Sequence, residues 1–64
     1  MDKGIQVIMH CALSDSLSAA IDTGNIAEIV DVMTDAKNCL HAAQINLEQY
    51  ADLQADVQVA GYEL

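Results

Sequence analysis

The chain has 64 residues, of which ten are acidic and two are basic, so its formal net charge at pH 7 is −8. It has no arginine, and this shortage of cationic side chains excludes direct binding to nucleic acid or to anionic membranes. Proline, phenylalanine and tryptophan are also absent, and the residues that dominate favour helices over strands. We therefore expect one small all-α domain spanning residues 1–64.

The first predicted helix covers residues 3 to 22. Its apolar residues recur at the three- and four-residue spacing of one helical face. They are Ile5, Ile8, Met9, Ala12, Leu13, Leu17, Ala20 and Ile21. Val7 and Cys11 lie outside this stripe, and together with Ile8 they form a second apolar patch, a candidate contact surface. Gly24 suits the left-handed position after a helix, so we expect a turn at residues 23–25.

The second predicted helix starts after Asn25, which together with Glu28 is typical of a capping box. Its apolar residues repeat every seven positions along two seams, as they do in coiled coils. One seam contains Ile26, Met33, Leu40 and Leu47, and the other contains Ile29, Ala36, Ala43 and Tyr50. No glycine or proline interrupts the pattern before Gly61, so we predict one helix over residues 26 to 60. Alanines alternate with large residues along the seams, which indicates a close approach between helices.

These two helices predict an antiparallel hairpin in which the second helix is much the longer. Its part from residue 47 onward then has no partner inside its own chain. Because an apolar stripe in water usually marks an interface, we predict a homodimer that forms a four-helix bundle. The predicted oligomer interface consists of Leu47, Tyr50, Leu53 and Val57. The alternative is a three-helix bundle with a break near residues 35–38, which buries the same stripe within one chain.

Six acidic residues of the second predicted helix form two rows opposite its apolar seams. One row is Glu28, Asp31 and Asp35, and the other is Glu48, Asp52 and Asp56. Carboxylates four residues apart on a helix stand about 6 Å apart along its axis, comparable to the phosphate spacing of a nucleic-acid strand. We predict that these rows contact a partner protein with a basic surface, such as a nucleic-acid-binding groove. The alternative is that the acids only keep the protein soluble.

Two histidines and two cysteines are the other residues with distinctive chemistry. His10 adjoins Cys11, and Cys39 is two residues from His41. Successive helical residues point about 100° apart, so these side chains diverge, and we expect neither a zinc site nor a disulfide within one chain. The sequence also shows no nucleophile with a convergent base and no glycine-rich phosphate loop. We therefore expect no enzymatic activity and no cofactor.

The sequence thus predicts a non-enzymatic regulator or inhibitor that binds another protein. With no signal-peptide pattern at the start of the chain, we expect it to work in the cytoplasm. Two alternatives remain open: a coiled-coil-like assembly, adaptor or chaperone module, and a Cys/His metal or redox site at an oligomer interface. The salt dependence of partner binding distinguishes the regulator from the assembly module, because a complex held together by charge weakens as ionic strength rises.

Overall fold

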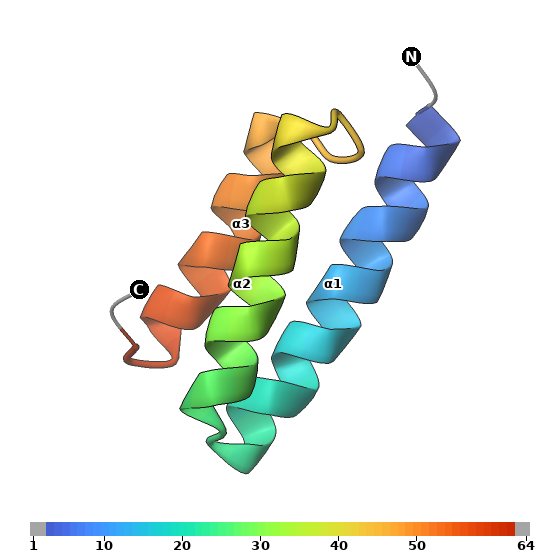
Figure 1. The fold of residues 1–64 in the computed structure, drawn as a ribbon. Helices are drawn as coiled ribbons and strands as arrows, with labels where there is room; N and C mark the ends of the chain where they lie inside the picture. The colour runs from blue at the N-terminus through green and yellow to red at the C-terminus, as the bar shows by residue number, and fades with distance from the viewer. Residues whose placement is uncertain (1–2, 63–64) are drawn as a thin grey trace.

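The computed structural model describes residues 3–62, and within this range the chain folds into three helices packed as a bundle (Figure 1). The helices are α1 (Lys3–Thr23), α2 (Ile26–His41) and α3 (Leu47–Val59). α2 runs antiparallel to its two neighbours, so α1 and α3 point in the same direction (Figure 1). The all-α prediction is confirmed, whereas the two-helix hairpin is wrong. The three-helix alternative is the correct one, although its break lies further along the chain than predicted.

The predicted long helix is interrupted at residues 42–46. Ala43 adopts a left-handed backbone conformation with φ of 59°, and the N–H of Gln44 donates to the carbonyl of Cys39. Asn46 then begins α3 with a reciprocal capping box. Its side chain accepts a hydrogen bond from the Gln49 N–H, and the Gln49 side chain accepts one from the Asn46 N–H. The heptad pattern hid this turn, because apolar residues continue in register on both sides of it.

The capping role of Asn46 leads to a stability prediction. Replacing Asn46 with alanine should lower the free energy of unfolding by about 1 kcal/mol, because the first turn of α3 loses its side-chain acceptor. The matched control is Asn38→Ala, at an exposed position inside α2, where alanine favours the helix and no loss is expected. Urea unfolding followed by circular dichroism measures both variants. Equal losses at the two positions would contradict the capping role.

The end of α1, the start of α2 and the end of α3 lie next to glycines, as the sequence predicted. α1 ends at Thr23, one residue beyond the predicted end, and Gly24 has φ of 69°. The Asn25 side chain accepts a hydrogen bond from the Glu28 N–H at 3.2 Å, as expected for a helix cap. Gly61 follows α3 with φ of 94°, and the Tyr62 N–H donates a hydrogen bond to the carbonyl of Val57. A left-handed glycine with such a backward hydrogen bond is a common helix ending.

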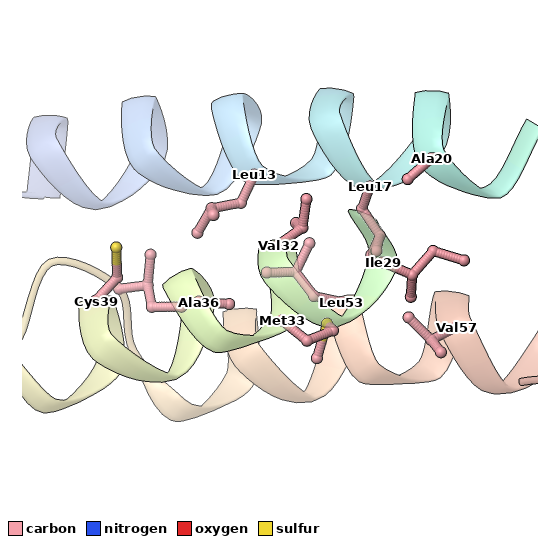
Figure 2. Packing of buried hydrophobic residues seen from close by; sticks show 11 residues of the cluster. Leu13, Leu17, Ala20, Ile29, Val32, Met33, Ala36, Cys39, Leu53 and Val57 are labelled. Atoms are coloured by element: carbon pink, nitrogen blue, oxygen red, sulfur yellow. The ribbon is translucent and has the colours of Figure 1, made fainter. Parts of the chain in front are cut away.

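The core lies between the three helices and draws apolar residues from each of them (Figure 2). The buried residues are Leu13, Leu17 and Ala20 of α1; Ile29, Val32, Met33, Ala36 and Cys39 of α2; Ile45 of the turn; and Leu53 and Val57 of α3. Ala20 and Ala36 are completely buried. Small side chains at such positions let helix backbones approach closely, as the alternation of alanines indicated.

Most residues of the predicted dimer interface lie in or against the core of the single chain. Leu53 and Val57 are buried inside the single chain, at 0% and 1% exposure, and Tyr50 packs partly buried against the same core. The turn at residues 42–46 folds α3 back onto the other helices, so the stripe is covered without a second copy. Of the four predicted interface residues, Leu47 alone is exposed, at 69%.

Candidate functional site

The first half of α1 carries apolar side chains that the core does not use. Ile5, Val7 and Ile8 are 47%, 56% and 67% exposed, and Cys11 and Ala12 are also exposed. We call these five residues the α1 patch. The buried residues of α1 begin only at residue 13, and Figure 1 shows the N-terminal end of α1 diverging from the other helices.

This exposure corrects part of the predicted stripe on the first helix. Ile5 and Ala12 were expected to face the second helix, but they are exposed. Ile8, which belongs to the predicted stripe and also to the second apolar patch, is exposed as well. Leu13, Leu17 and Ala20 are the stripe residues that enter the core (Figure 2), and Met9 and Ile21 pack against it partly buried. The first half of α1 is apolar on most of its circumference, so its periodicity alone did not define the buried side. The second apolar patch of the sequence analysis is part of the α1 patch.

The α1 patch is a continuous uncharged surface on one helix. Ile8 lies three residues from Ile5 and Cys11 and four from Ala12, so these side chains are neighbours on the helix surface. The chain has no aspartate, glutamate, lysine or arginine from Gly4 to Ser14. From Ile5 to Ala12 the patch extends about 10 Å along the helix axis. Exposed acids follow it further along α1, at Asp15 and Asp22.

One predicted acidic row lies on α3 next to α1. This α3 row consists of Glu48, Asp52 and Asp56, all exposed. His10 Nε2 lies 3.6 Å from Asp52 Oδ2, and Gln49 Nε2 donates to the backbone carbonyl of Gln6 at 3.3 Å. The other two acids are four residues from Asp52 in either direction, so they share its side of the helix. The α3 row therefore borders the α1 patch.

The other acidic row lies on the side of α2 that is next to α1. This α2 row consists of Glu28, Asp31 and Asp35, also exposed. Figure 2 shows Val32 and Cys39 pointing from α2 towards α1, and Glu28 and Asp35 each lie four residues before one of them. Because α2 is antiparallel to α1, the α2 row flanks mainly the second half of α1. The two rows predicted on one helix therefore lie on two helices, one on each side of α1.

The opposite side of α2 forms a different surface. Val30, Met33, Thr34 and Lys37 line an open groove together with Tyr50 of α3. Lys37 is exposed there, so the groove has a basic edge while the surface around α1 is acidic. The sequence analysis missed this groove, because the groove exists only where α3 folds back along α2.

The cysteines and histidines are distributed over different environments. Cys11 is exposed in the α1 patch, whereas Cys39 is buried, and both are free thiols. His10 lies beside the carboxylate of Asp52, and His41 is exposed at the end of α2. Within residues 3–62, no three His, Cys, Asp or Glu side chains are grouped so that they could hold a metal ion.

α1 also has the length and composition of a membrane-spanning segment. Among the helices that the structure describes, it alone is long and apolar enough to cross a membrane on these two criteria, over Gly4–Thr23. No uninterrupted apolar run in this segment exceeds three residues, so the sequence analysis did not predict this property. In the bundle, the second half of this helix supplies Leu13, Leu17 and Ala20 to the core.

Compared with models of known protein families, with curated proteins and with solved structures, the chain shows no significant match.

Proposed function

We propose that this protein is a non-enzymatic regulator that binds another protein through the α1 patch. The observation that carries the proposal is the exposure of Ile5, Val7 and Ile8 on one uncharged stretch of helix. Fully burying one such side chain is worth roughly 1.5–3 kcal/mol. A patch of this kind on a small domain is typical of a protein contact surface.

The charges around the patch favour a partner that differs from this chain. A homodimer through the α1 patch would bring the α3 rows of two copies close together, and like charges at an interface oppose association. A partner with a basic surface would instead be attracted to the acidic rows. The assembly-module alternative loses support, because the heptad seams on which it rested are interrupted at residues 42–46 and their central residues, Ile29, Met33 and Ala36, are buried within the single chain. The exposed free thiol of Cys11 fits a reducing compartment, so we propose the cytoplasm as its location.

The test of this function is the substitution Ile8→Asp. A carboxylate at the centre of the α1 patch would have to be buried in the complex, so binding of cellular partners should fall roughly tenfold or more. Folding should be retained, since Ile8 is 67% exposed. The measurement is quantitative capture of proteins from extracts of the producing cells, with wild type and variant compared at equal concentration.

The matched control is Val59→Asp. Val59 is 88% exposed at the last turn of α3, at the end of the bundle away from the α1 patch. It receives the same added charge, so it reports any general effect of greater acidity. Binding that survives Val59→Asp and is lost in Ile8→Asp supports the proposal. Binding that is equal in both variants would mean that the α1 patch is not the contact surface.

A further inference from the structure

We infer that the partner presents a basic amphipathic helix, which lies along α1 with its apolar side chains on the α1 patch and its lysines or arginines against the acidic rows. This inference rests on the proposed function and specifies the partner. Its three supports are the shape of the patch, the sign of the surrounding charge and the unequal distribution of that charge along α1.

The shape of the α1 patch favours a helix as its occupant. Ile5, Ile8 and Ala12 repeat at three- and four-residue spacing on the exposed side of α1, and ridges of this spacing pack into the grooves of another helix. Residues 3–62 contain three helices joined by short turns and no strand. Within this range there is therefore no sheet edge to which an extended peptide could add by backbone hydrogen bonds.

The charge around α1 requires that this helix be basic. The α2 row, the α3 row and the two acids of α1 are all exposed, whereas α1 has no lysine or arginine from Gly4 to Thr23. Lys37 lies on the other side of α2, at the groove next to α3. Like-charge repulsion therefore disfavours an acidic peptide, a second copy of this chain or an anionic lipid surface on α1.

The unequal distribution of charge also orients the occupant. The α1 patch occupies the first half of α1, and its acidic border is the α3 row, through Asp52 beside His10. Asp15, Asp22 and the α2 row surround the second half. The partner helix should therefore carry its main apolar residues at one end and an excess of basic residues towards the other.

The experiment uses the full chain and a designed helical peptide of roughly 18 residues, or five turns. The peptide has leucines at three- and four-residue spacing near one end and lysines on both flanks, concentrated at the other end. A matched peptide has glutamate in place of every lysine. Fluorescence anisotropy should show binding of the lysine peptide alone, with a Kd that rises about tenfold or more from low to high salt.

Variants locate the peptide on the protein. Neutralising Asp31, Asp35, Asp52 and Asp56 together to asparagine should weaken binding of the lysine peptide by about tenfold or more and remove most of the salt dependence. Ile8→Asp should weaken binding at both salt concentrations. Lys37→Gln is the control on the far side of α2 and should leave the Kd within about twofold, because that groove is not the proposed site.

Other outcomes overturn the inference and separate it from the proposed function. If Ile8→Asp abolishes capture of a cellular protein but the lysine peptide does not bind, the partner is not a basic helix and the proposed function stands. Equal binding of the two peptides, or an unchanged Kd in the neutralised variant, would also overturn it. Binding of the protein to zwitterionic vesicles, lost in Ile8→Asp, would identify a lipid surface as the occupant instead.

Discussion

Replacing Leu53 with alanine is expected to unfold a large fraction of the protein at room temperature. Leu53 is completely buried, and truncating such a leucine costs about 2–5 kcal/mol, through lost burial and the cavity left behind. A domain this small rarely holds more than about 3–5 kcal/mol of stability in total. One substitution in α3 should therefore remove most of it, with the loss read from urea unfolding followed by circular dichroism.

Leu47→Ala is the matched control, because it is the same substitution in the same helix at a side chain that is 69% exposed. We expect a change of at most about 0.5 kcal/mol. In the hairpin dimer both leucines would have lined the interface, so similar losses would support that arrangement. A urea midpoint of unfolding that rises with protein concentration would also support the hairpin dimer. A core within one chain gives a midpoint that does not depend on protein concentration.

The second large effect is expected for Ala36→Leu. Ala36 is completely buried in the core (Figure 2), so a leucine side chain has no space without displacing its neighbours. Overpacking of this kind typically costs about 1–3 kcal/mol. Thermal unfolding followed by circular dichroism should show a clearly lower midpoint than that of the wild type.

The control for Ala36→Leu is Ala27→Leu, on the exposed side of the first turn of α2. Leucine and alanine both favour helices, so its midpoint should stay close to that of the wild type. If Ala36→Leu is as stable as this control, the close packing at Ala36 is not present in solution.

The heptad pattern predicted the buried side of α2 well but did not predict where that helix ends. Met33 and Ala36 lie on its seams and are buried. The break depends on Ala43, and a left-handed residue other than glycine costs roughly 1–2 kcal/mol. The nearby burial of Ile45, which is 2% exposed, offsets that cost. Such compensation arises from tertiary packing, so a local pattern cannot show it.

The sequence predicted which residues form the acidic rows, but it did not predict how these rows and the α1 patch are arranged in space. The exposure of Asp35, Asp52 and the other acids follows from their place opposite the apolar seams. Their position on both sides of α1 depends on α3 folding back along α2. The predicted single helix over residues 26–60 has no turn that would allow this. Three of the five residues of the α1 patch, Ile5, Ile8 and Ala12, belong to the apolar stripe predicted on the first helix. They are exposed because that stripe extends beyond the part of α1 that the other helices cover.

A photo-crosslinker attached to Cys11 tests the central claim most directly, because this exposed thiol lies in the α1 patch and Cys39 is buried. The comparison is the same label at Thr34→Cys in a Cys11→Ser background, since Thr34 is exposed and lines the groove between α2 and α3. In extracts of the producing cells, we predict that the Cys11 label joins the protein to a basic partner and that the Thr34→Cys label does not. Crosslinking from the Thr34→Cys position alone, or between two copies of this chain through Cys11, would contradict the account.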